Sequence, residues 1–202
     1  MEVIEFRYIR RDEPYDKKYE AWSRVYEYPL VFRRLADLEV GKESLIHNSS
    51  WGFMGCHVDF KNDLDAIYPL SVHSDIRPSD LANTFLYDIT KPPMFHMKNA
   101  FDVVINISTV EEVGYDNVAI IRNLYDQVKP GGYLIITFDY HPQNLRPGNG
   151  SIELDKVEAF VGRTIDPCEP DQRINGDSSV CPHHYFNYLN CGLLILRKNS
   201  HA

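Results

Sequence analysis

Residues 101–140 read FDVVINISTVEEVGYDNVAIIRNLYDQVKPGGYLIITFDY, and this stretch decides the fold class of the 202-residue chain. The run 103–107 is short, β-branched and continuously apolar, which is typical of a strand buried on both faces. Apolar residues at three- and four-residue spacings predict a helix over 118–128, and Lys129-Pro130-Gly131-Gly132 ends it. A second buried strand follows over 133–138. This order predicts a βαβ unit with a right-handed crossover in an open parallel sheet.

The rest of the chain continues the alternation of strands and helices. Further strands are predicted over 43–47, 70–74, 84–87 and 191–198. Helices are predicted over 15–28, over 29–38 with Pro29 as first residue, after Gly55 with Phe60, Leu64 and Ile67 on one side, and over 152–160. The pattern predicts one α/β domain with a doubly wound, mostly parallel sheet. We expect an N-terminal arm over 1–18, whose first residues also fit an edge strand, and a domain over 19–202 that carries a variable substrate-side insertion over 141–190.

Composition describes a globular protein without naming its chemistry. Hydrophobic residues make up 44% of the chain, and no stretch approaches the roughly 18 apolar residues of a membrane span. The N-terminus has no apolar secretion signal, so we expect the cytoplasm. The net charge of −8 argues against general nucleic-acid binding and leaves open only a local basic groove at Arg24, Arg33 and Arg34.

The cysteines indicate neither a disulfide framework nor a metal site. Four cysteines are too few for such a framework in a chain of this length, and a cytosolic protein keeps them reduced. No CxxC spacing occurs among the residues that might suggest zinc, so no metal is expected. Those residues are Cys168, Cys181, His183, His184 and Cys191.

Residues 101–138 resemble the second half of the class I S-adenosylmethionine-dependent methyltransferases. In that family an "FDVV…" strand, an acidic segment and an "L…LKPGG.L…" turn occur in the same order. The resemblance covers roughly residues 19–198. It implies a seven-stranded Rossmann-like sheet whose last strand is antiparallel. It also implies S-adenosyl-L-methionine as cofactor and methyl transfer to a small molecule or glycan precursor as the reaction.

The first strand-to-helix loop is the first place to look for a cofactor, because open α/β sheets bind ligands at the carboxyl ends of their strands. The loop reads Asn48-Ser49-Ser50-Trp51-Gly52-Phe53-Met54-Gly55. The resembled family has a GxGxG-like loop here, in which glycines let the backbone approach the cofactor. This chain keeps Gly52 and Gly55, and Asn48, Ser49 and Ser50 offer hydrogen bonds in place of other glycines. A tight structural turn is the alternative, and Trp51 either flanks the site or packs beneath the sheet.

Acidic and polar residues end the next strands. Asp75 ends the second strand 20 residues after Gly55, where a nucleoside-binding sheet places an acid for the ribose hydroxyls. A helix cap is its alternative role. Asp88 ends the third strand, and the resemblance implies a contact with the adenine amino group, although a turn before Pro92 is equally ordinary. Ser108, at the end of the fourth strand, is also a candidate cofactor residue.

The segment before the first strand supplies two more candidates. In many members of the resembled family a preceding helix lies over the cofactor. Arg24 is then suited to the methionine carboxylate, and Tyr28 to the sulfonium or the adenine. The alternative is a helix packed on the sheet with its charges in solvent.

Three residues are candidates for catalysis. Asp139 and His141 follow the fifth strand at the ligand crevice, and an O-methyl transfer benefits from a base with a pKa near neutrality. Glu112 stands where some family members carry His in an "S.IEHVG" segment. Because neighbouring residues on a strand point to opposite faces, we expect either Glu111 or Glu112 to cap the following helix.

Three functions remain open at this stage. The first is an active methyltransferase acting on a small molecule, and the second is a methyltransferase-like binding or scaffold protein without catalysis. The third is a nucleotide-binding α/β protein of another class, such as a nucleotide-sugar enzyme. The sequence leaves the methyl acceptor and the oligomeric state undetermined.

Overall fold

The computed structural model describes residues 1–19, 23–52, 55–141, 150–169, 172–174 and 190–200. These residues form a seven-stranded sheet with the order β1-β7-β6-β5-β2-β3-β4. The strands are β1 (Glu2–Tyr8), β2 (Ile46–Ser49), β3 (Val72–Asp75), β4 (Thr84–Leu86), β5 (Phe101–Ile107), β6 (Val128–Tyr140) and β7 (Asn190–Arg197). The helices are α1 (Arg24–Asp37), α2 (Cys56–Ile67), α3 (Asn117–Gln127) and α4 (Leu154–Val161), with short 3₁₀ helices η1 (Lys17–Tyr19) and η2 (Phe95–Met97).

The sheet is mostly parallel, as predicted. Strands β2 to β6 pair in parallel, whereas β7 pairs antiparallel with both β6 and β1. The strand β1 pairs with β7 and forms one edge of the sheet. The first part of the expected arm at 1–18 is therefore an edge strand. Its Phe6 is fully buried in the core.

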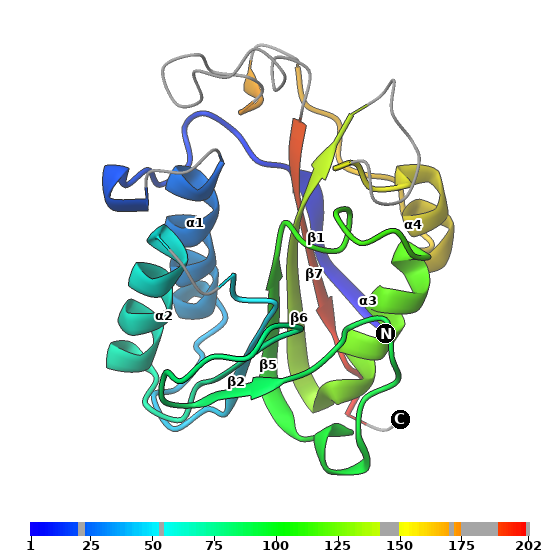
Figure 1. The fold of residues 1–202 in the computed structure, drawn as a ribbon. Coiled ribbons are helices and arrows are strands. Elements are labelled where there is room, and N and C mark those ends of the chain that lie inside the picture. Colours follow the sequence, from blue (N-terminus) through cyan, green and yellow to red (C-terminus); the bar gives the residue numbers. More distant parts are fainter. Residues whose placement is uncertain (20–22, 53–54, 142–149, 170–171, 175–189, 201–202) are drawn as a thin grey trace.

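Helices cover both faces of the sheet. Figure 1 shows α1 and α2 on one side and α3 and α4 on the other. An apolar core fills each interface. Within β5, Val103 and Ile105 point to the α1–α2 side and Val104 points to the α3–α4 side. Burial on both faces explains why this strand has no alternation of polar and apolar residues.

The β5–α3–β6 unit follows the sequence prediction closely. Asp116 caps α3, because its carboxylate accepts hydrogen bonds from the backbone N–H groups of Val118 and Ala119. The expectation that Glu111 or Glu112 caps this helix is therefore wrong. The strand β6 begins earlier than predicted and includes the Lys129-Pro130-Gly131-Gly132 segment. Gly132 is required there, since a Cβ would lie 2.4 Å from the carbonyl oxygen of Asp102.

The N-terminal helices differ from the prediction. One helix, α1, replaces the two helices expected to meet at Pro29, and Pro29 lies inside it. Proline has no N–H to donate to the carbonyl four residues earlier, which belongs to Val25. The backbone N–H of Asp16 donates to that carbonyl instead, at 2.9 Å. In α2 the prediction also fails at Ile67, which is 42% exposed.

Candidate functional site

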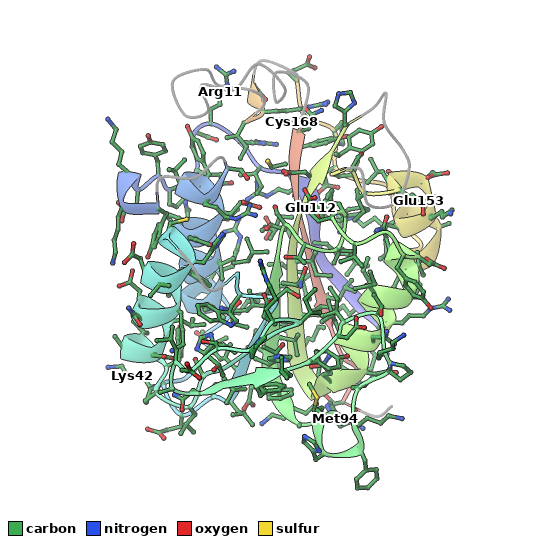
Figure 2. All side chains as sticks on the ribbon, viewed as in Figure 1. Arg11, Lys42, Met94, Glu112, Glu153 and Cys168 are labelled. Carbon is green, nitrogen blue, oxygen red and sulfur yellow. The ribbon has the colours of Figure 1, made fainter. Side chains whose placement is uncertain are left out.

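The carboxyl ends of the parallel strands surround two adjoining cavities. The larger measures about 620 Å³ and the smaller about 160 Å³. Ser50, after β2, and Thr109, after β5, line both of them. Glu112, labelled in Figure 2, belongs to the lining of the larger cavity, whereas Lys42 and Met94 mark the opposite end of the sheet.

The larger cavity combines two carboxylates with an apolar wall. Asp75 and Asp88 line it together with the apolar side chains of Ile76, Leu86 and Ile89. Its volume lies within the range of pockets for small ligands. Carboxylates beside an apolar wall are suited to a ligand with hydroxyl groups and a flat ring, such as a nucleoside.

The two carboxylates also shape the loops that carry them. Asp75 accepts hydrogen bonds from the N–H groups of Gly52, at 3.3 Å, and Arg77, at 3.1 Å. It caps no helix, because β4 is the next regular element along the described chain. Asp88 accepts from the backbone N–H and the hydroxyl of Thr90, which holds the pKa of Asp88 below its ordinary value. Asp75 thus ties the end of β3 to the glycine loop.

The smaller cavity contains a buried ion pair from α1. Arg24 and Glu27 form this pair and are 8% and 0% exposed, so the alternative of a helix with solvated charges is wrong. One oxygen of the Glu27 carboxylate contacts Arg24 and accepts a hydrogen bond from the Ser23 hydroxyl at 2.7 Å. The other oxygen accepts from the Ser108 hydroxyl at 2.5 Å. Arg24 lines the cavity, and its Nε has no hydrogen-bond partner among the described residues.

Both members of this pair are ionised. Burial alone raises the pKa of Glu27, but the Arg24 charge and the hydrogen bond from Ser108 outweigh it, so that the pKa lies below its ordinary value. Burial alone lowers the pKa of Arg24, and the Glu27 carboxylate reverses that effect. The Arg24 guanidinium therefore faces the cavity as a cation, and its ion pair with Glu27 holds it in position. Such a group is suited to a carboxylate of a ligand.

Tyr28 and His57 close the smaller cavity on the helical side. The Tyr28 ring stacks on Phe60 with centroids 4.1 Å apart, and its hydroxyl contacts Nδ1 of His57. Burial, and after it the Arg24 charge, lower the pKa of His57 to about 4, so its ring is neutral. The ring lies against Gly52, where a Cβ would lie 2.9 Å from it and where φ is +79°. Glycine is therefore required at this position of the loop.

Two of the candidate bases, Asp139 and His141, lie beyond the two cavities. Asp139 ends β6, and its carboxylate accepts from the Cys191 thiol at 2.9 Å across the β6–β7 ladder. Burial and the Glu27 charge raise the pKa of Asp139 to about 7. Its backbone N–H donates to Glu111, which is fully buried and whose own pKa is raised well above the ordinary value, chiefly by burial. His141 is half-buried, and its backbone N–H donates to the Ser151 hydroxyl at 2.8 Å.

The structure thus brings most of the candidate residues to one end of the sheet. Those that line the two cavities are Arg24, Tyr28, Asn48, Ser50, Gly52, Asp75, Asp88, Ser108 and Glu112. Those that do not are Ser49, Gly55, Asp139 and His141. Ser49 is buried within β2, and Gly55 begins α2. Trp51 lines the smaller cavity and is 3% exposed.

Sequence reasoning missed two residues of the smaller cavity and its surroundings. Glu27 lies three residues after Arg24, a spacing that places both on one side of a helix, but nothing local indicates that the pair is buried. His57 lies in the first turn of α2, and the only signal was its position directly after the glycine loop.

The described residues hold no group of three His, Cys, Asp or Glu side chains placed to bind a metal ion. Cys181, His183 and His184 lie outside the described residues. None of the described helices has both the length and the apolar character required to cross a membrane.

Comparison with solved structures identifies the fold. No protein-family model matches the sequence, and neither does any curated protein. The structure is similar to that of the [4+2]-cyclase SpnF, with a TM-score of 0.60 and 12% sequence identity. The match covers 97% of this chain and 88% of the SpnF chain. A putative sarcosine dimethylglycine methyltransferase from Galdieria sulphuraria matches 92% of this chain and 94% of its own, with a TM-score of 0.56 and 11% identity.

The methyltransferase CalH, solved as a complex with SAH, matches 88% of this chain with a TM-score of 0.57 and 16% identity. The present chain spans 57% of the length of CalH. The chain therefore has the seven-stranded fold of the class I S-adenosylmethionine-dependent methyltransferases. Because one of its structural neighbours is named as a cyclase, the fold leaves the reaction undetermined.

Proposed function

We propose that this protein binds S-adenosyl-L-methionine across the two cavities and transfers its methyl group to a small molecule. The observation that carries the proposal is the pair of adjoining cavities with different chemistry. Asp75 and Asp88 line the larger one, and Arg24 and Asn48 line the smaller one. A ligand that joins a nucleoside to an α-amino acid fits this division.

The described residues fit such a ligand in both parts. We assign Asp75 to the ribose hydroxyls and Asp88 to the adenine amino group, because both line the larger cavity beside its apolar wall. We assign Arg24 to the carboxylate, since its buried Nε has no hydrogen-bond partner within the described part of the chain. Ser108 holds Glu27 behind Arg24. Tyr28 lines only the smaller cavity, so we assign it to the amino-acid part and not to the adenine.

The protein's own contribution to the transfer is positioning and proton removal. S-adenosyl-L-methionine, when bound, supplies a methyl group on a positively charged sulfur. Asp139 is our candidate base, because a carboxyl with a pKa of about 7 is half ionised near neutrality and can take a proton from a hydroxyl acceptor. Glu112 and His141 are alternatives at the same end of the sheet. The acceptor that we propose is a small molecule or glycan precursor in the cytoplasm.

Calorimetric titration with S-adenosylhomocysteine tests the proposal, with NAD and a nucleotide sugar as comparison ligands. We expect only the first to bind. At 100 times its dissociation constant it should stabilise the fold by about 2.7 kcal/mol, measured as a rise in melting temperature. Binding of NAD or the nucleotide sugar in its place would move the protein to another class of nucleotide-binding protein.

A binding protein without catalysis is the second candidate. The observation that favours it is the contact of the His57 ring with Gly52, because this ring covers backbone that a cofactor approaches in the resembled family. Such a protein binds S-adenosylhomocysteine but transfers no methyl group to any member of a panel of small hydroxyl and amine acceptors. Labelled methyl transfer to that panel separates the two candidates.

A further inference from the structure

A chain of hydrogen bonds leads from the smaller cavity to the outer helix α2. Nδ2 of Asn48 lies 3.2 Å from Nδ1 of His73, and Nε2 of His73 lies 2.8 Å from Oδ1 of Asp65. The other oxygen of Asp65 accepts from the Lys61 ammonium at 2.7 Å. Of these four residues, Asn48 alone lines the cavity.

The fold determines this arrangement. Asn48 and His73 are direct partners in the parallel β2–β3 ladder, so their side chains lie side by side on one face of the sheet. Both are buried, with 2% and 0% of their surface exposed. The Trp51 ring lies edge-on to His73, with centroids 6.2 Å apart. Little freedom remains for either side chain.

Along this series of hydrogen bonds, only one assignment of donors and acceptors is consistent. An ionised carboxylate only accepts, so Nε2 of His73 carries the proton that it shares with Asp65. Burial lowers the pKa of His73, which keeps the ring neutral and leaves Nδ1 as an acceptor. Only the NH₂ group of Asn48 can donate to that nitrogen. Its carbonyl oxygen Oδ1 is then free, and it makes no hydrogen bond with the described residues.

We propose that His73 and Asp65 are positioning residues that hold the Asn48 carbonyl oxygen toward the smaller cavity, where it accepts a hydrogen bond from a cationic amino group. Arg24 lines the same cavity and is suited to a carboxylate. An acceptor and a cation placed together complement a zwitterionic α-amino acid. The identity of the ligand rests on the proposed function, whereas the orientation of the amide rests on the hydrogen bonds alone.

The proposal predicts what happens when Asp65 can donate. In Asp65→Asn the carboxamide oxygen stays with the Lys61 ammonium, which can only donate, so the NH₂ group faces Nε2 of His73 and the ring carries its proton on Nδ1. The Asn48 amide then turns, since it must accept from Nδ1, and its NH₂ group faces the cavity. We expect this variant to bind S-adenosylhomocysteine at least tenfold more weakly.

A second substitution should restore binding. In the double variant Asp65→Asn with Asn48→Asp, both carboxylate oxygens accept, so one can face His73 and the other the cavity. We expect affinity to return to within about threefold of the wild type. The matched control is Lys61→Gln, which breaks the ion pair on the far side of Asp65 and leaves His73 its acceptor. Its affinity should stay near that of the wild type, even if its melting temperature falls.

Nitrogen chemical shifts of His73, measured by NMR without ligand, test the orientation independently. The wild type should show the proton on Nε2, and Asp65→Asn should show it on Nδ1. A wild-type protein with the expected tautomer that binds no S-adenosylhomocysteine would remove the proposed function and still support the orientation. Unchanged affinity in Asp65→Asn, a wild-type proton on Nδ1, or a double variant that stays weak although folded would each overturn the positioning role.

Discussion

The β5–α3–β6 unit and the helix α1 bury their side chains in opposite ways. The strands and helix of the first bury mainly apolar residues, such as Val104, Ile121 and Leu124, together with uncharged polar ones such as Asn117 and Gln127. The second buries apolar residues on one side and the ion pair of Arg24 and Glu27 on another. Apolar burial stabilises without a specific partner, whereas a buried charge is stable only when its partner is in place. The comparison indicates that α1 serves the site as well as the core.

The largest expected effect is that of removing one member of the buried pair. Glu27→Ala leaves the Arg24 charge without its partner in a buried place, so we expect a loss of about 4 kcal/mol in the free energy of unfolding. Urea denaturation followed by circular dichroism measures it. Replacing both residues, with Arg24→Met and Glu27→Leu, should cost much less, because no unpaired charge remains. A double variant as unstable as Glu27→Ala would show that the charge itself is not the cause.

A substitution in the apolar core of the β5–α3–β6 unit should affect stability and leave ligand binding unchanged. Leu124 is fully buried in the core between α3 and the sheet, and we expect Leu124→Ala to cost about 3 kcal/mol in unfolding free energy. Its affinity for S-adenosylhomocysteine should be unchanged at temperatures where the variant is folded. Loss of affinity in Leu124→Ala would mean that the apolar core around α3 and the ligand site are coupled.

The same contrast explains what could be predicted from the sequence. The β5–α3–β6 unit was predictable because its periodicity and its turn are local. Asp75 and Asp88 were predictable as candidates because each directly follows a strand. The role of Glu27 was not, because the partner that holds it, Ser108, lies 81 positions away. The single helix α1 was not predictable either, since its proline depends on a hydrogen bond from Asp16 in a preceding loop.

A smaller effect is expected at the larger cavity. Asp75→Ala removes the acceptor that we assign to the ribose, and we expect it to weaken S-adenosylhomocysteine binding by about 2 kcal/mol, or more than tenfold. Part of the loss will come from the glycine loop, because Asp75 also accepts from the Gly52 N–H. Calorimetry measures the affinity, and the control is Asp80→Ala, at an exposed carboxylate outside the lining of the cavity. Unchanged affinity with a lower melting temperature would make Asp75 a purely structural residue.

The smallest expected effect concerns the charge on Asp139, and it appears as a dependence on pH. The pKa of Asp139 in the folded protein is about 7, chiefly because of burial, and its ordinary value is 3.8. The folded state therefore holds this proton more tightly than the unfolded chain. The stability that the proton contributes is complete below about pH 4 and is lost as the pH rises toward 7 and beyond.

Asp139→Asn removes this titration and keeps a similar shape. We expect the melting temperature of this variant, relative to that of the wild type, to rise by about 3–5 °C between pH 6 and pH 8, which corresponds to about 1.4 kcal/mol for a chain of this size. Differential scanning calorimetry at the two pH values measures the change, and Glu43→Gln, at an exposed carboxylate next to Lys42 at the opposite end of the sheet, is the control. The same temperature difference at both pH values would show that Asp139 does not titrate between them. A carboxylate already ionised at pH 6 is a weak base, so that result would also remove Asp139 as the candidate for proton removal.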